Sequence, residues 1–259
     1  MPLGHEVDRA TKIFERMKAN RAYILATTDT FGKRSPELVK AQKHFVEIVK
    51  KKLNEFGIAV IEESVDMFDP QEVIKRMSSI IIKELANKNI VYINISSAGR
   101  LTAAVALLVA MAHKVKAYYM EASGYSDNPE DRNIHGISIC HENKPVWIEN
   151  LPVEMPPKQE MEVLKLLKTK NRPLKINEIA LHLARKGFPQ FAKHRNALEK
   201  TIPRNHPDYD ELINCSMKLN KGILEKLEAK GYIRRERQGR ENLVILEDSG
   251  GFIANFCGN

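Results

Sequence analysis

The sequence lacks the patterns that mark several large classes of protein. Its three cysteines, Cys140, Cys215 and Cys257, are far apart and form no C-x-x-C pair. Their spacing argues against a disulfide scaffold or a zinc site and favours a reducing compartment. The longest apolar run, around residues 103–112, is too short to cross a bilayer. The opening residues MPLGHEVDRATK lack the basic and then apolar order of a secretory signal. We therefore expect a cytoplasmic protein that needs no membrane and no metal.

Positive charge is concentrated in one part of the chain. The 259 residues carry a net charge of +8. Residues 1–156 hold 21 Lys and Arg against 20 Asp and Glu, a net charge of +1, whereas residues 157–259 hold 20 against 13, a net charge of +7. A basic region attached to a neutral one indicates a nucleic-acid partner, although a merely solvated basic surface would have the same composition.

The first part of the chain alternates between helical and strand-like segments. Apolar, β-branched runs at residues 22–28, 58–66, 89–95 and 116–121 are typical of buried strands. Amphipathic helices are expected at residues 37–57 and 70–88, the second of them capped by Asp69 with Pro70 in its first turn. Strands separated by helices of this length predict an α/β fold, with a mostly parallel sheet covered by helices on both faces.

Two segments close this part of the chain. Residues 135–152 read as two strands around a turn at ENKP, which predicts an antiparallel hairpin at the sheet edge. Three prolines, Pro152, Pro156 and Pro157, then form a stiff connector. We therefore predict two domains, at residues 1–153 and 154–259.

The C-terminal part resembles a winged helix-turn-helix of the multiple-antibiotic-resistance regulator type. The matching stretches are SMKLNKGILEKLEAKGYI, the basic hairpin RRERQGRENL and the closing LEDSGGFIA. Gly231 stops a helix predicted at residues 216–230, whose core stripe is Leu219, Ile223, Leu224 and Leu227.

The resemblance implies binding to double-stranded DNA. A helix of this kind enters the major groove, and the hairpin that follows it contacts phosphates or the minor groove. The residues expected at the DNA are Lys218, Lys221, Arg234, Arg235, Arg237 and Arg240. The alternative is a winged helix used for protein contact, with these charges facing solvent.

The segment NISSAGRLTAAVALLVAM, residues 94–111, places hydroxyl residues, a glycine and an arginine between a strand and a helix. Ligands of open parallel sheets lie beyond the carboxyl ends of the strands, and a helix N-terminus favours an anion there. Gly99 permits close approach and Arg100 supplies positive charge. The alternative is a capped helix start in an α/β domain that binds no ligand.

This segment resembles the Asn-x-[Ser/Gly]-[Ser/Gly]-x-[Lys/Arg] signature of CARF domains, the CRISPR-associated Rossmann-fold sensors. PLGHEVDR, VDMFDPQEV and KAYYMEASGY extend the likeness over the N-terminal half. With the winged helix, the chain resembles archaeal CARF-type transcriptional regulators. The resemblance implies a homodimer that binds a cyclic oligoadenylate at its two-fold axis, with no other cofactor. The ligand-binding residues it implies are Gly4, His5, Glu6, Arg9, Thr27, Ser96, Ser97, Gly99, Arg100 and Thr102.

Two departures from the family pattern leave alternatives open. The chain holds almost nothing of the first strand that should precede residues 4–9, so its start is misplaced or truncated, or the sheet lacks an edge beside this loop. The segment also carries Ser-Ser where many relatives have Gly-Gly, and Arg where they have Lys, which leaves open a ligand of another size or one other than a cyclic oligoadenylate. The leading interpretation is a ligand-responsive transcriptional regulator. The alternatives are a metal-independent ring nuclease that cleaves cyclic oligoadenylate and a dimeric scaffold with a vestigial pocket.

Overall fold

The computed structural model describes residues 1–27, 35–142, 144–151, 153–200, 206, 209–239 and 241–258. The chain divides into two compact units, Met1–Glu154 and Met155–Cys257. The boundary expected after residue 153 lies beside this division. Each unit is described by itself. No helix in the described ranges combines the length and the apolar character that a membrane crossing requires.

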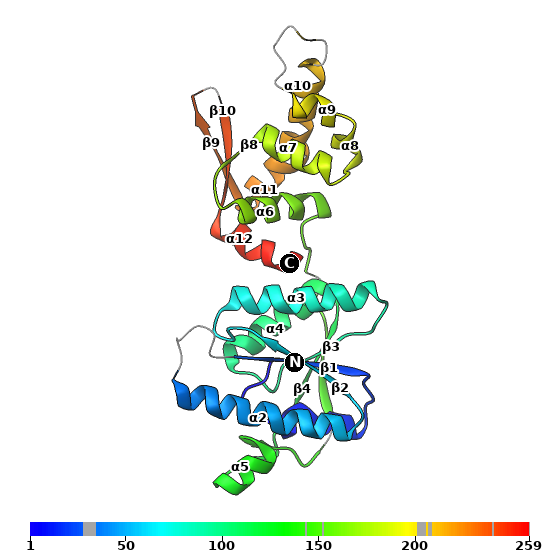
Figure 1. Cartoon of the computed structure of the whole chain (residues 1–259), viewed down its shortest axis with the longest axis vertical. Helices are drawn as coiled ribbons and strands as arrows, with labels where there is room; N and C mark the ends of the chain where they lie inside the picture. Colours follow the sequence, from blue (N-terminus) through cyan, green and yellow to red (C-terminus); the bar gives the residue numbers. More distant parts are fainter. Residues whose placement is uncertain are drawn as a thin grey trace. The chain divides into compact units, whose positions relative to one another are not determined.

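The first unit is an α/β unit whose strands are mainly parallel. Strand β1 (Arg21–Ala26) pairs in parallel with β2 (Ala59–Ser64), and β3 (Tyr92–Asn94) pairs in parallel with β4 (Lys116–Met120). The crossovers are α2 (Pro36–Glu55), α3 (Pro70–Ala86) and α4 (Arg100–His113). In Figure 1, α3 and α4 lie on one side of the strands and α2 lies on the other. The predicted fold class is confirmed for this unit.

The first four residues lie between β1 and β3. Pro2 forms a parallel bridge with Leu25 of β1, and the Leu3 amide donates to the Leu25 carbonyl at 2.9 Å. On the other side, the Gly4 amide donates to the Ser97 carbonyl at 2.5 Å. The strands therefore follow the spatial order β2, β1, residues 1–4, β3, β4.

Local sequence explains where the crossover helices begin. Ser35 caps α2 by accepting from the Leu38 amide at 3.3 Å, and Pro36 follows it. Asp69 caps α3 by accepting from the Gln71 amide at 2.8 Å, and Pro70 follows it, as predicted. The core beneath α2 holds Leu3, Val7, Ile24, Val46, Val49 and Leu53.

The predicted hairpin at residues 135–152 is wrong in its pairing. Strand β7 (Pro145–Ile148) is an antiparallel edge strand, as expected, but its partner is β4. The short strand β6 (Ser138–Ile139) pairs instead with β5 (Gly124–Tyr125). Between β5 and β6 lies α5 (Pro129–His135). The two segments are neighbours along the chain but belong to different sheets.

The second unit begins with α6 (Lys158–Lys170), β8 (Leu174–Lys175) and α7 (Ile176–Arg185). Two short helices follow, α8 (Pro189–Ala192) and α9 (Arg195–Glu199). A longer helical stretch then runs through α10 (Tyr209–Leu219), a π-helical turn η2 (Asn220–Leu224) and α11 (Glu225–Ala229). It begins at Tyr209 rather than at the predicted residue 216.

A three-stranded antiparallel sheet completes the second unit. Its order is β8, β10 (Glu241–Leu246), β9 (Ile233–Gln238), and α12 (Asp248–Ala254) follows it. The predicted helix stripe is confirmed, because Leu219, Ile223, Leu224 and Leu227 are all buried in the core of this unit. Gly231 has a φ of +69°, the left-handed conformation predicted for the end of that helix. A helical core with a β-hairpin beside it is the arrangement of a winged helix.

Candidate functional site

The two loops predicted to bind ligand lie side by side at the carboxyl ends of the strands. We call residues 4–9 the first loop and residues 96–102 the second loop. Besides the bond from Gly4 to Ser97, the Arg9 Nη1 atom donates to the Ser96 carbonyl at 3.4 Å. The Gly4 position is tight, because a Cβ there would lie 3.2 Å from the Ser97 oxygen. The fold thus brings together two sequence segments about 90 residues apart.

The two serines of the second loop bond within the protein. Ser97 is fully buried, and its Oγ donates to the Pro2 carbonyl at 2.8 Å. Ser96 is also buried, and both its amide and its Oγ donate to Oδ1 of Asn94, at 2.9 and 2.5 Å. Asn94 in turn donates from Nδ2 to the Arg9 carbonyl at 2.7 Å. Ser97 thus joins the second loop to the segment ahead of the first loop, and Asn94 connects Ser96 to Arg9 of the first loop.

Thr27 and Thr102 both form hydrogen bonds with the main chain of Met67. The Met67 amide donates to Thr27 Oγ1 at 3.3 Å, and Thr102 Oγ1 donates to the Met67 carbonyl at 2.8 Å. Both threonines are buried. They fasten the segment between β2 and α3 to the ends of β1 and α4. Thr28, the next residue, lies outside the described residues.

Glu6 and Arg9 of the first loop also face inward. Glu6 is buried and accepts from the Ser138 amide at 3.0 Å and from Ser138 Oγ at 2.8 Å. Burial raises the pKa of this carboxyl group, against the opposing effect of Ser138 and Arg9. Arg9 lies 3.7 Å from Glu6 and stacks its guanidinium over the Tyr119 ring at 5.1 Å. Its Nε atom is buried without a hydrogen-bond partner among the described residues.

Three of the predicted ligand-binding residues are exposed or half-buried. Arg100 and Gly99 are exposed at the start of α4, and Gly99 is the N-cap residue with no side-chain hydrogen bond. His5 is half-buried and stacks on Phe45 with 5.1 Å between the ring centroids. Burial lowers the pKa of His5, which favours the neutral imidazole. An N-terminus of a 14-residue helix with a flanking arginine favours an anionic ligand.

Asp8 is a structurally important residue that the sequence patterns did not single out. Asp8 is almost fully buried. One of its oxygens, Oδ2, lies 2.9 Å from Nδ1 of His135 and accepts from the Cys140 amide at 3.1 Å. These partners are about 130 residues away along the chain. No local spacing rule reports such a contact, so the sequence carried no usable signal.

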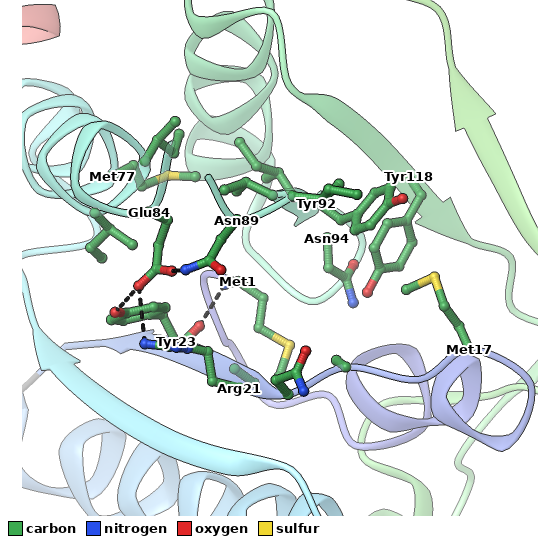
Figure 2. Close-up of a pocket in the computed structure, with 18 of the residues that line it drawn as sticks. Met1, Met17, Arg21, Tyr23, Met77, Glu84, Asn89, Tyr92, Asn94 and Tyr118 are labelled. Carbon is green, nitrogen blue, oxygen red and sulfur yellow. Dashed lines mark hydrogen bonds and ion pairs between the residues drawn. The ribbon is translucent and has the colours of Figure 1, made fainter. Parts of the chain in front are cut away.

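A cavity of about 720 Å³ lies at the opposite, amino-terminal end of the strands. Its lining includes Met1, residues 17–23, which lead into β1 and form its first part, and residues 88–94, which lead into β3 and include it. Figure 2 shows Arg21 and Tyr23 on one side of this space and Tyr92 and Asn94 on the other. Within the described ranges, no group of three or more His, Cys, Asp or Glu side chains is arranged to hold a metal ion.

In the second unit, Lys218 and Lys221 are exposed on the long helical stretch. Lys218 lies in the last turn of α10, and Lys221 lies in the π-helical turn η2, next to Gly222. The buried stripe of Leu219, Ile223 and Leu227 faces the core on the other side. The structure therefore leaves both lysine side chains available to a partner.

The wing arginines differ from one another. Arg235 forms an ion pair with Glu228, with Nε donating to Oε2 at 2.8 Å. Arg234 pairs with Glu236 and, through Nε at 2.8 Å, with Glu247. Arg237 is exposed, and its Nε donates to the Gly239 carbonyl at 3.3 Å, with no acidic partner among the described residues. Arg240 lies outside the described residues. Arg237 is thus the wing arginine with the most accessible charge among the three described.

Two protein families match this chain, one in each unit. Residues 1–125 match the family described as "HFX_2341_N:-like, N-terminal". Residues 159–258 match the family described as "DUF6293 C-terminal winged helix domain". The second match agrees with the helices and hairpin described above. The chain therefore joins an N-terminal α/β domain of the first kind to a C-terminal winged helix domain. No curated protein sequence matches it.

Several solved structures show a distant overall similarity. Csm6 of Enterococcus italicus, bound to cyclic hexa-2'-fluoro-hexa-dAMP, is 16% identical, with 88% of this chain covered and a TM-score of 0.41. Can2 of Sulfobacillus thermosulfidooxidans, in complex with cyclic tetra-adenylate, is 12% identical, with 98% covered and a TM-score of 0.37. Protein VC1899 of Vibrio cholerae is 12% identical, with 99% covered and a TM-score of 0.38. This chain covers only 55%, 60% and 64% of those three chains.

Proposed function

We propose that this protein is a ligand-responsive, DNA-binding transcriptional regulator. Its first unit would bind a cyclic oligoadenylate at the axis of a homodimer, and its winged helices would bind double-stranded DNA. The main support is the junction of the two loops, where the Gly4 amide bonds to the Ser97 carbonyl beside the exposed Arg100. The resemblance of these loops to those of CARF domains supplies the ligand class.

The chemistry of the second loop suits a phosphate-bearing ligand. A cyclic oligonucleotide presents one phosphate for each nucleotide. Arg100 offers a permanent positive charge with a fork of donors, and the start of α4 offers main-chain N–H groups. The buried bonds of Ser96 and Ser97 hold the loop in a fixed shape, so less ordering is needed on binding.

Regulation requires that the ligand bind two arrangements of the dimer with different affinity. Two winged helices on one duplex must match two half-sites that lie about one helical turn, or a multiple of it, apart. A ligand at the dimer axis that favours one arrangement would change DNA affinity by the coupling free energy, typically about 1–3 kcal/mol. We therefore expect ligand binding to change the affinity for DNA by roughly 5- to 150-fold.

Titration calorimetry with cyclic tri-, tetra- and hexa-adenylate tests the ligand half of the proposal. We expect one ring size to bind, and the Arg100→Ala variant to bind at least about tenfold more weakly, since a lost charge-assisted contact costs about 1.5–3 kcal/mol. Arg16→Ala is the matched control, because Arg16 is exposed and lies just ahead of β1, at the other end of the strands. Linear products after incubation would indicate a ring nuclease. No binding of any ring would contradict the proposal and support the scaffold alternative.

DNA binding as a function of salt concentration tests the other half. Lys221→Ala and Arg237→Ala should each lower the slope of log affinity against log salt by about one, if each contacts one phosphate. Lys170→Ala, an exposed lysine at the end of α6, should leave the slope unchanged. If all three variants keep the original slope, neither the long helix nor the wing contacts DNA.

A further inference from the structure

The exposed side of helix α10 carries apolar side chains next to basic ones. Ile213 is 43% exposed and Met217 is 47% exposed, and they lie one helical turn apart. Asn214 and Lys218 are exposed on the same helix, and Lys221 is exposed about one turn further on. We call these five residues the outer face, and its two apolar members the apolar pair. Exposed apolar side chains at helical spacing on a basic surface indicate a partner with both apolar and anionic groups.

The buried positions of α10 show which way this face points. Cys215 and Leu219 are fully buried, and Met217 lies two residues from each of them. Because an α-helix has 3.6 residues per turn, Met217 points away from the core that both of them enter. On the core side, Ser216 Oγ donates to Asn177 Oδ1 of α7 at 3.3 Å. These contacts hold α10 in place and leave the outer face accessible.

The polar groups of the outer face are available to a partner. Among the residues that the structure describes, none forms a hydrogen bond or an ion pair with the side chain of Asn214, Lys218 or Lys221. Gly222 follows Lys221 in the π-helical turn η2, and a Cβ built at Gly222 would meet no heavy atom within 4 Å. The surface beside Lys221 is therefore open to a bulky group such as a phosphate.

Charge and size favour the major groove of DNA as the partner of this face. The two lysines stand beside the apolar pair, whereas the exposed carboxylates of Asp210 and Glu225 lie before and after the face. Phosphates repel those carboxylates, so the contact is confined to residues 213–221. These residues span about 12 Å at a rise of 1.5 Å per residue, and the major groove has about the same width.

The side chains of the outer face select A·T base pairs within that groove. The C5 methyl group of thymine is the apolar group that the base edges present there. An asparagine side chain forms two hydrogen bonds with adenine, accepting from N6 and donating to N7. Residues 209–229 contain no arginine, whose fork of donors matches the two acceptors of guanine.

We propose that the outer face of α10 recognises A·T base pairs in the major groove, with Asn214 bonded to adenine and the apolar pair packed on thymine methyl groups. Lys218 and Lys221 then contact the flanking phosphates. The Nη1 atom of Arg235 donates to Asn220 Oδ1 at 3.5 Å, which joins the wing to the same helix. This inference rests on the proposed DNA binding and names the residues that determine its sequence specificity.

Fluorescence anisotropy with alternating duplexes tests the thymine contacts. The probes are poly(dA-dT), poly(dA-dU) and poly(dG-dC) at one salt concentration, and they need no known operator because each presents a single repeated step. The full-length protein should bind poly(dG-dC) at least about fivefold more weakly than poly(dA-dT). Uracil lacks only the C5 methyl group of thymine, so poly(dA-dU) should bind about three- to fivefold more weakly for each methyl contact that is lost.

Two variants of Met217 assign this difference to the outer face. Met217→Ala should reduce the ratio of the affinities for poly(dA-dT) and poly(dA-dU) by about threefold, because the side chain no longer reaches a methyl group. Met217→Leu should keep the ratio, since leucine is apolar and of similar volume. Leu85→Ala is the matched control, because Leu85 is also 43% exposed but lies on α3 of the first unit, and it should leave the ratio unchanged.

A second change in the DNA tests Asn214. The base 7-deazaadenine lacks the N7 acceptor, so poly(dA-dT) made with it should bind the protein at least about threefold more weakly. Asn214→Ala should bind the two forms equally, because it has no donor for N7. The Leu85→Ala control should keep the difference.

Three outcomes would overturn the inference. Equal affinity for poly(dA-dT) and poly(dA-dU), with a strong salt dependence for both, would leave DNA binding in place and remove base recognition by this face. A changed oligomeric state of Met217→Ala in sedimentation, with both affinity ratios unchanged, would make the outer face a protein contact. Binding to none of the duplexes, with or without cyclic tri-, tetra- or hexa-adenylate, would contradict the proposed function and this inference with it.

Discussion

The two ends of the strands in the first unit differ in whether their polar groups are buried in hydrogen bonds within the fold or face a cavity. At the carboxyl ends, the hydroxyls of Ser96, Ser97 and Thr102 and the carboxylate of Glu6 are buried and bonded to other parts of the fold. At the amino ends, main-chain groups of Tyr23 and Tyr92 face a cavity. Residue composition therefore does not tell which end is open. A hydroxyl-rich loop can be a structural joint, and an apolar, aromatic stretch can border the accessible space.

Among the variants that compare the two ends of the strands, Glu6→Ala should have the largest effect on the free energy of unfolding. This change leaves the Ser138 amide and hydroxyl buried without an acceptor, and it also removes the charge beside Arg9. We expect a loss of about 3 kcal/mol in the free energy of unfolding, measured by urea denaturation. Glu15→Ala is the control at an exposed position and should stay within about 0.5 kcal/mol. A loss below about 1 kcal/mol for Glu6→Ala would show that the carboxyl ends are not held by this bond network.

The pH dependence of stability should reveal the burial of the Met1 amine at the amino-terminal ends of the strands. The Met1 amine has a pKa of about 5 in the folded protein and 8.0 in the unfolded chain, so the unfolded state binds the extra proton between these values. Stability should therefore fall as pH drops from 8 to 5, by roughly 2 kcal/mol between pH 8 and 6.5. Lys18, Arg21, Glu84 and Lys88 line the same cavity. The Tyr23 hydroxyl lowers the pKa of Glu84, so this carboxylate keeps its charge over that window.

The control for this pH effect is the same protein with Met1 acetylated and its mass verified. Acetylation removes the titrating amine, so the fall between pH 8 and 6.5 should disappear. Stopping at pH 6.5 keeps the measurement above the pKa values of His5 and His113, both of which burial lowers from 6.5. If the acetylated protein loses the same stability between pH 8 and 6.5, other groups cause the effect and the Met1 amine does not.

A matched pair of hydroxyl deletions gives a smaller effect. Ser97→Ala removes the buried donor to the Pro2 carbonyl and should cost about 1–2 kcal/mol. Tyr23→Phe removes the donor to Glu84, but that carboxylate keeps Asn89 and Arg21 and borders the cavity, so the cost should be about 0.5 kcal/mol or less. Urea denaturation of both variants measures the difference. Equal costs would mean that the two ends are equally closed to water.

Sequence patterns predicted those parts of the fold whose signals are local. The cap and proline at Asp69 and Pro70 gave the start of α3, and the glycine at residue 231 gave the end of the long helix. The alternation of strands and helices gave the fold class, because parallel strands need helical crossovers. The hairpin at residues 135–152 failed because pairing is decided between β7 and β4, which are distant in sequence.

The candidate site was predictable in its position but not in the direction of its side chains. The order of strand, small residues and helix located the second loop at the carboxyl end of β3. It did not reveal that Ser97 points at Pro2, because that contact spans 95 residues. In the wing, the run of arginines was visible, but the pairing of Arg235 with Glu228 was not, since it depends on how β9 packs on α11. Direction is set by tertiary contacts that single-sequence patterns do not contain.

The smallest expected change in stability belongs to Arg100→Ala, at the carboxyl ends of the strands. Arg100 is exposed at the start of α4, and the described residues give it no ion pair or hydrogen bond from its side chain. Its loss should therefore change the free energy of unfolding by less than about 0.5 kcal/mol. Arg9→Ala, in contrast, removes the bond to the Ser96 carbonyl and the stacking on Tyr119, so it should cost about 1 kcal/mol or more. If Arg100→Ala were the more destabilising of the two, this arginine would serve the fold, and its assignment to a ligand would lose its main support.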